Sequence, residues 1–105
     1  MDADDAPLVE LRFATTVIHW RGPSPFFYAP IPPDQAEPIR RVARAVTYGW
    51  GVIPVEATIG ETTFTTSLFP RDETYLLPLK AAVRRQTAIT AGDTVAVTMI
   101  IRAPR

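Results

Sequence analysis

Two basic side chains that share one helical face are the clearest chemical signal in the sequence. Lys80 and Arg84 are four positions apart, which places them on one face of a helix. Lys80 is expected in the first turn of a short helix over 80–86, where free backbone amides attract an anion. With the hydroxyls of Thr66 and Ser67, these cations predict a phosphate or carboxylate pocket. The simpler alternative is a solvated helix face whose cations pair with Asp or Glu.

Aromatic residues are expected to form the walls of such a pocket. Small-ligand sites combine apolar walls with a few polar groups that fix the ligand. The walls would lie at the mouth of a β-barrel, with Lys80 or Arg84 as the polar anchor. The residues assigned to this small-anion site are Lys80, Arg84, Ser67, Trp20, Tyr28, Trp50 and Tyr75. The alternative is that aromatic residues beside glycines fill the barrel end as part of the core.

A second basic cluster points to a different class of ligand. Proteins that bind single-stranded nucleic acid combine cations with aromatic rings. The candidate nucleic-acid surface comprises Arg40, Arg41, Arg44, Lys80, Arg84 and Arg85. Because the formal net charge is +0, there is no global positive field to attract nucleic acid. Nucleic-acid binding is therefore an alternative interpretation, and the cluster on the first helix is otherwise a solvated rim.

Groups suited to catalysis are few. His19 has the chemistry of a base for Ser24 or Ser67, but an imidazole beside a tryptophan at a strand end is more often structural. Asp72 and Glu73 are adjacent acids of the kind found in solvated loops. The chain has no cysteine and one histidine, and it carries no phosphate-binding loop, dinucleotide fingerprint or nucleophile elbow. We therefore expect no catalytic residues, no metal, no cofactor and no enzymatic activity.

Most of the chain has the alternating pattern of half-buried strands. Apolar and polar residues alternate from 8 to 17, the pattern blurs over 17–20, and it returns in segments 26–29, 55–59, 62–69, 75–79 and 95–101. The blurred stretch suggests a bulge or a segment covered on both faces. Gly60 and Glu61 fit a type II′ two-residue turn. Pro78 implies an edge strand or a strand end.

Two segments have helical patterns. Apolar residues at i, i+3, i+4 and i+7, beginning at Ile39, give one buried face to a helix over 35–45. Asp34 and Glu37 have the spacing of a capped helix start. Together the elements predict a mainly β protein: a single small closed or split β-barrel of about six strands, with one amphipathic helix and one short helix. We expect residues 8–105 to form this domain after a flexible acidic tail over 1–7.

Composition sets the broad class of the protein. Hydrophobic residues make up 47% and charged residues 21% of the chain, values of a globular domain rather than a disordered one. No apolar run approaches the roughly 20 residues of a membrane-spanning helix. The first ten residues are acidic, unlike a signal peptide. We therefore expect a soluble, cytoplasmic protein with no membrane partner.

Four motifs carry a resemblance to a known family. They are PVEATIG over 54–60, TSLFP over 66–70, YLLPLKAAVR over 75–84 and GDTV over 92–95. As a set they resemble the bacterial and archaeal domain-of-unknown-function family numbered nineteen hundred and five, a small closed β-barrel. The resemblance implies a fold and no activity, because that family has no established reaction or ligand. More weakly, the order of Leu77, Pro78, Val83 and Arg84 before the GD turn is similar to swapped-hairpin DNA-binding domains.

These observations favour a non-enzymatic binding or interaction β-barrel module of unknown function. The alternatives are a nucleic-acid-binding regulator of swapped-hairpin-like type and a barrel that binds a small anionic ligand. The expected partner is a small anion or a protein, with nucleic acid as the other option. We expect a monomer or a homodimer, because an uncovered edge strand near Pro78 would be able to pair across a two-fold axis.

Overall fold

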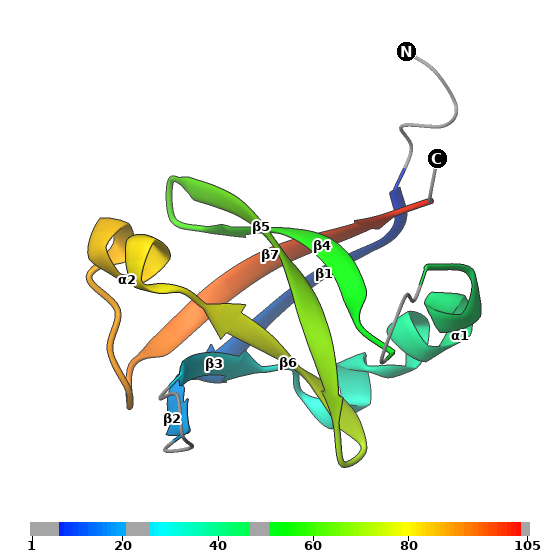
Figure 1. Cartoon of the computed structure of the whole chain (residues 1–105), viewed down its shortest axis with the longest axis horizontal. Coiled ribbons are helices and arrows are strands. Elements are labelled where there is room, and N and C mark those ends of the chain that lie inside the picture. Colours follow the sequence, from blue (N-terminus) through cyan, green and yellow to red (C-terminus); the bar gives the residue numbers. More distant parts are fainter. Residues whose placement is uncertain (1–6, 21–25, 47–50, 104–105) are drawn as a thin grey trace.

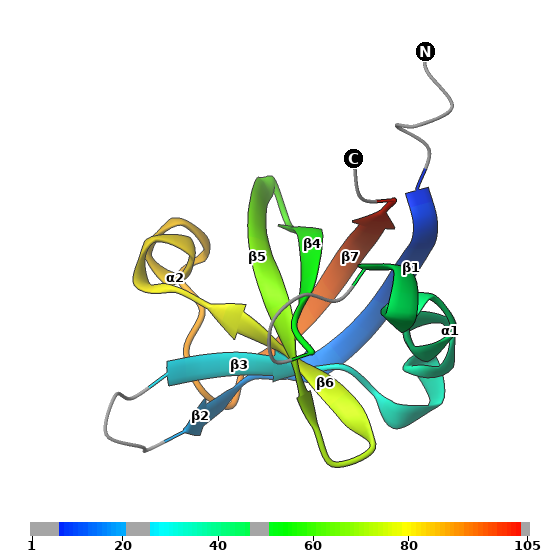
Figure 2. The same ribbon diagram turned by 45° about the vertical axis from the view of Figure 1, so that its right-hand side comes forward.

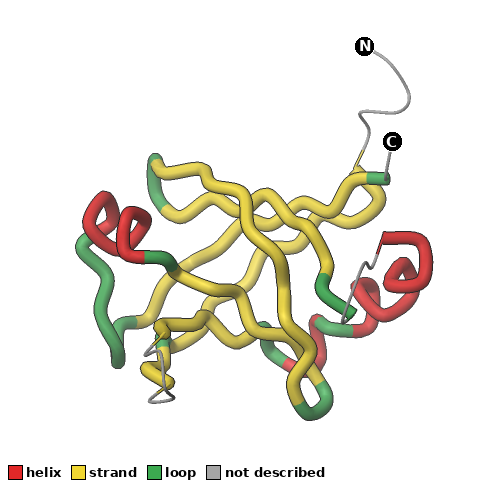
Figure 3. Tube along the Cα trace, viewed as in Figure 1, coloured by secondary structure: helices red, strands yellow, loops and turns green. Residues whose placement is uncertain are grey.

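The computed structural model describes residues 7–20, 26–46 and 51–103. Its elements, shown in Figure 1, are β1 (Pro7–Thr16), β2 (Ile18–Trp20), β3 (Phe26–Pro30), the 3-10 turn η2 (Pro33–Gln35), α1 (Glu37–Val46), β4 (Ile53–Ile59), β5 (Thr62–Arg71), β6 (Thr74–Leu79), α2 (Ala81–Thr87) and β7 (Thr94–Arg102). Strands dominate the described chain (Figure 3). The expectations for residues 1–6, Ser24 and Trp50 lie outside the described residues.

The strands form one antiparallel sheet that curls into a half-barrel. Their order is β1-β7-β4-β5-β6-β3-β2, and every described pairing is antiparallel. The mainly β prediction is confirmed, but the closed barrel of about six strands was wrong. The sheet is open and has seven strands within the described residues. Its two end strands, β1 and β2, are consecutive in the chain and are joined through one residue.

Val17 separates β1 from β2 and explains why the sheet has a seventh strand. Its amide donates to the carbonyl of Asp93 at 2.9 Å, and its carbonyl accepts from the amide of Gly92 at 2.8 Å. Val17 is 1% exposed, so the chain bends there and changes partner from β7 to β3. The blurred alternation therefore marks a bend. The expectation of a segment covered on both faces was wrong, because Ile18, His19 and Trp20 are all exposed.

The core lies on the inner face of the curled sheet. Alternate residues of β1, β4 and β7 are buried, as the period of two predicts. Helix α1 packs against β1 and β4 through the apolar face predicted for it, with Ile39 fully buried. The helix begins at Glu37, and Asp34 lies in the preceding 3-10 turn. The predicted capped start at Asp34 was therefore wrong, because Pro32 and Pro33 carry the chain into that turn first.

Strand β5 changes neighbour along its length. Its pairing with β4 runs from Thr62 to Leu68, and its pairing with β6 runs from Phe69 to Arg71. The pair of Phe69 with Leu76 is the last between β5 and β6. Beyond Leu76, strand β6 pairs only with β3, and Pro78 lies opposite Tyr28. Of the two expectations for Pro78, the strand end is confirmed, since β6 ends at Leu79, and the edge strand was wrong, since β6 lies inside the strand order.

Candidate ligand-binding site

A cleft opens where β5 and β6 diverge. It has a volume of about 380 Å³ and is lined by Phe26, Tyr28, Thr66, Ser67, Phe69, Pro78, Leu79 and Lys80. These residues come from β3, β5 and the end of β6, which lie side by side in Figures 1 and 2. Proline has no amide hydrogen to donate to a ladder. The end of β6 at Pro78 therefore lacks one of the bonds that would draw a neighbouring strand close.

A smaller hollow adjoins the cleft. Its volume is about 200 Å³, and its lining adds Phe27, Ala81 and Arg84 to three residues of the cleft, namely Phe26, Leu79 and Lys80. Lys80 is the N-cap of α2 and has an extended backbone. It precedes the first turn of the helix, so the prediction that Lys80 lies within that turn was wrong. The two hollows form a site in two parts, with a cation where they meet.

The walls of the cleft are mainly aromatic and apolar. The rings of Phe26 and Tyr28 are 6.2 Å apart between centroids, and Phe26 and Phe69 are 49% and 46% exposed. Such exposure of large rings beside a hollow is the arrangement expected of a binding surface. The hydroxyl-bearing residues Tyr28, Thr66 and Ser67 supply polar groups along the same lining.

Arg84 is held in place by the protein. Its guanidinium carbon lies 3.9 Å from the centroid of the Phe27 ring, and its Nε donates to the carbonyl of Leu79 at 3.3 Å. Phe27 is stacked on His19 with centroids 4.5 Å apart. A cation over an aromatic face is attracted by the ring quadrupole. Arg84 is therefore positioned at the smaller hollow by an aromatic ring and a backbone carbonyl.

The two cations of the site have no acidic partner among the described residues. No aspartate or glutamate lines either hollow. The ion pairs between described residues belong to Arg40, Arg41, Arg71 and Arg102. Lys80 and Arg84 are absent from that set. The prediction that these cations pair with acids on a solvated helix face is therefore not met in the part of the chain that the structure describes.

The other residues assigned to a small-anion site are dispersed. Tyr75 is 8% exposed and lines a separate hollow with Arg40 and Glu73. Trp20 is exposed and lies outside both parts of the site. The structure thus brings together Tyr28, Ser67, Lys80 and Arg84. Sequence reasoning missed Phe26, which alternation places on the face of Tyr28, and Phe69, which carries no local signal.

A comparison with protein families covers all of these residues. Residues 13–99 match the model of a family described as Domain of unknown function (DUF1905). The chain belongs to this family. The family resemblance read from the sequence motifs is confirmed. No curated protein matches the chain.

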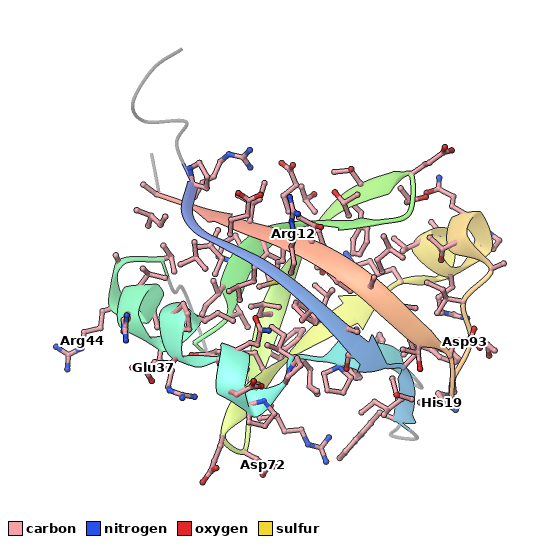
Figure 4. All side chains as sticks on the ribbon, turned by 180° about the vertical axis from the view of Figure 1, so that it is seen from behind. Arg12, His19, Glu37, Arg44, Asp72 and Asp93 are labelled. Carbon is pink, nitrogen blue, oxygen red and sulfur yellow. The ribbon has the colours of Figure 1, made fainter. Side chains whose placement is uncertain are left out.

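The two basic clusters of this DUF1905 domain do not form one surface. Helices α1 and α2 lie at opposite ends of the molecule (Figure 1), and Figure 4 places Arg44 at the opposite end of the molecule from His19. Arg40 and Arg41 pair with Glu37 at 3.3 and 3.5 Å. Arg85 is exposed on α2. A ligand that contacts Lys80 and Arg84 is therefore remote from the cluster on α1.

The groups considered for catalysis are also separate in the DUF1905 domain. His19 contacts Phe27, and no hydrogen bond joins it to another described side chain. Asp72 is exposed at a turn with φ +52° and lies 3.8 Å from Arg71. The described residues contain no group of three His, Cys, Asp or Glu side chains able to hold a metal. None of their helices is long and apolar enough to cross a membrane.

Proposed function

We propose that this DUF1905 domain is a non-enzymatic binding module and that the cleft between β5 and β6 takes a small organic anion with a flat apolar body. The observation that carries the proposal is the position of Lys80. Its side chain lines both hollows, and no carboxylate of the described residues pairs with it. A carboxylate or phosphate at this point gains a charge-assisted hydrogen bond.

The aromatic walls account for the apolar part of the ligand. Burying apolar surface is favourable by about 25 cal/mol per Å². Phe26 and Phe69 are close to half exposed, so a flat ligand group laid against them removes apolar surface from water on both sides. The hydroxyls of Tyr28, Thr66 and Ser67 would orient polar atoms of the ligand.

Arg84 supplies a second cation and so supports the proposed anion site. The Phe27 ring and the Leu79 carbonyl hold it in one place, so little side-chain entropy is lost when an anion binds. Covalent catalysis needs a nucleophile activated by a base, whereas the aromatic walls and cations of this site supply contacts to an anion. Binding without turnover is therefore the function that the described geometry supports best.

A thermal-shift series tests the proposal. The probes are phenyl phosphate and benzoate, with benzyl alcohol as the neutral counterpart. A ligand present at a hundred times its Kd adds about 2.7 kcal/mol of stability, which raises Tm by several degrees for a domain of this size. We expect shifts with the two anions and a much smaller shift with the alcohol.

Two variants of α2 and its cap make the test specific. Lys80→Gln is expected to abolish most of the anion-dependent shift. Arg85→Gln removes a charge from the same helix at a residue that lines neither hollow, and the shift should persist. Equal shifts with benzyl alcohol, or an undiminished shift in Lys80→Gln, would refute the anion site.

A further inference from the structure

One face of the half-barrel gathers most of the exposed large apolar side chains. Ile18, Trp20, Phe26 and Phe69 are four of the five that the described residues contain. The strand register places them together: Trp20 lies opposite Phe26, and Ile18 lies opposite Tyr28. The register continues from Tyr28 to Pro78 and from Leu76 to Phe69. Directly paired residues project from the same side of a sheet.

We call this side the aromatic face and define it by Ile18, Trp20, Phe26, Tyr28 and Phe69. It is the side opposite the core, because the alternate residues Ala29 and Leu77 are fully buried. It extends over β2, β3, β6 and β5, which at about 4.8 Å between strands is roughly 14 Å across. The cleft occupies only part of it, since Ile18 and Trp20 lie outside the cleft.

Two cations lie beside the rings of the aromatic face. The guanidinium carbon of Arg71 lies 3.7 Å from the centroid of the Trp20 ring, and Lys80 lines the cleft with Phe26. Arg71 also has Asp72 at 3.8 Å, but the Asp72 side chain is 88% exposed, so that pair is solvent-screened and weak. Positive charges therefore lie beside two neighbouring rings of this face.

We propose that the aromatic face binds a short stretch of single-stranded nucleic acid. A polymer whose units each carry a flat base and a phosphate complements a surface on which exposed rings have cations beside them. Bases would stack on Trp20, Phe26 and Phe69, and phosphates would contact Arg71 and Lys80. Arginine also stacks favourably on aromatic rings. The positive charge is local, which suits a chain with a net charge of +0.

The inference rests on the proposed function at one point, the cleft, which would hold one phosphate-bearing unit. It goes beyond that function because Trp20 and Arg71 form a second contact outside the cleft. A small anion needs only Lys80 and Arg84. A strand also needs Trp20 and Arg71.

Fluorescence anisotropy with a labelled oligothymidylate of about ten nucleotides tests the proposal. Two phosphate contacts predict that the logarithm of the association constant falls against the logarithm of salt with a slope of about −1.4. Trp20→Ala should weaken binding by about five- to 150-fold, the equivalent of losing one stacked base. Trp20→Phe keeps a ring and should retain most of the affinity. Arg71→Gln should reduce the slope by about 0.7.

Matched controls come from β1, away from the aromatic face. Leu8→Ala truncates an apolar side chain that is 45% exposed, close to the 43% of Trp20. Arg12→Gln removes an exposed cation that Figure 4 shows far from His19 on β2. Neither control should change the affinity for the oligonucleotide. A duplex of the same length should bind more weakly, because its bases are already stacked.

The outcomes separate this inference from the proposed function. Oligonucleotide binding that Trp20→Ala and Arg71→Gln weaken, with phenyl phosphate shifts unchanged in both variants, supports it. Phenyl phosphate binding without oligonucleotide binding overturns the inference and leaves the proposed function standing. Equal affinity for duplex, or for an acidic peptide of the same length, also overturns it. Oligonucleotide binding without any small-anion shift would instead refute the proposed function.

Discussion

The guanidinium group of Arg84 rests on the ring of Phe27, with 3.9 Å between the guanidinium carbon and the ring centroid. The two residues are 57 positions apart (84 − 27) in the sequence and meet because β3 pairs with the end of β6, Phe27 lying opposite Leu79. His19 from β2 stacks on the same ring. Three elements thus fix one cation beside the cleft before any ligand arrives, and preorganisation of this kind favours affinity.

Removing that ring should weaken anion binding. In Phe27→Leu the cation–π contact, about 0.5–2 kcal/mol, is lost and Arg84 regains side-chain freedom. We expect the Kd for phenyl phosphate, measured by isothermal titration calorimetry, to rise by about two- to thirty-fold. Ile18→Leu, on the neighbouring strand but outside both hollows, serves as the control. An unchanged Kd in Phe27→Leu would show that Arg84 does not depend on its ring.

The inner face of β6 should dominate the stability of the sheet. Leu77 is fully buried, and its truncation leaves a cavity that the neighbouring strands fill only in part. Leu77→Ala is expected to lower the free energy of unfolding by about 2–5 kcal/mol. Urea denaturation followed by circular dichroism measures the change. Leu8→Ala, at an exposed position, should stay within about 0.5 kcal/mol of the parent, and a similar loss in both would contradict the assignment of faces.

A hydroxyl connects β1, one end strand of the open sheet, to β3, the strand next to the other end. Thr15, near the end of β1, donates to the carbonyl of Pro30 at the end of β3. Thr15→Val keeps the shape and removes the donor, so we expect a loss of about 0.5–1.5 kcal/mol in unfolding free energy. Thr16→Val, one position along and exposed, should cost less. The same chemical denaturation applies, and equal effects at the two positions would argue against a role for this bond.

The turn before β7 depends on glycine. Gly92 has φ +91°, and its amide donates to the carbonyl of Val17 at the bend between β1 and β2. A Cβ added there meets nothing within 4 Å, so the cost of Gly92→Ala is backbone strain alone. We expect a loss of about 1–3 kcal/mol, read as a lower Tm in calorimetry. A Tm equal to that of the parent would mean that the turn adopts another conformation without cost.

Much of the local structure could be predicted from the sequence. The hairpin at Gly60 and Glu61 is confirmed, since Ile59 pairs with Thr62 and Gly60 has φ +59°, as a type II′ turn requires. The apolar face of α1 is also confirmed by the burial of Ile39 and Val46. Both features depend on residues within a few positions of one another, so their signals are local.

Long-range features escaped the sequence analysis. The bend at Val17 depends on hydrogen bonds from a turn more than 70 positions later (92 − 17 = 75), and the blurred alternation over 17–20 shows where the strand pattern changes but not that the chain bends there. The sequence predicted an edge strand or a strand end at Pro78, because proline has no amide hydrogen to donate to a neighbouring strand. Only the strand order shows that β6 is interior and that its final part pairs on one side.

The sequence by itself determined the strand character, the amphipathic helix, the family and the chemical types available to a ligand. Those properties follow from side-chain period and composition, which are local or additive. The tertiary structure decided which side chains meet. In the folded protein Lys80 and Arg84 lie beside aromatic residues of β3, whereas Arg40 and Arg41 form ion pairs with Glu37. Alternation assigns a residue to a face, but the neighbour of a strand is chosen by the packing of the whole sheet.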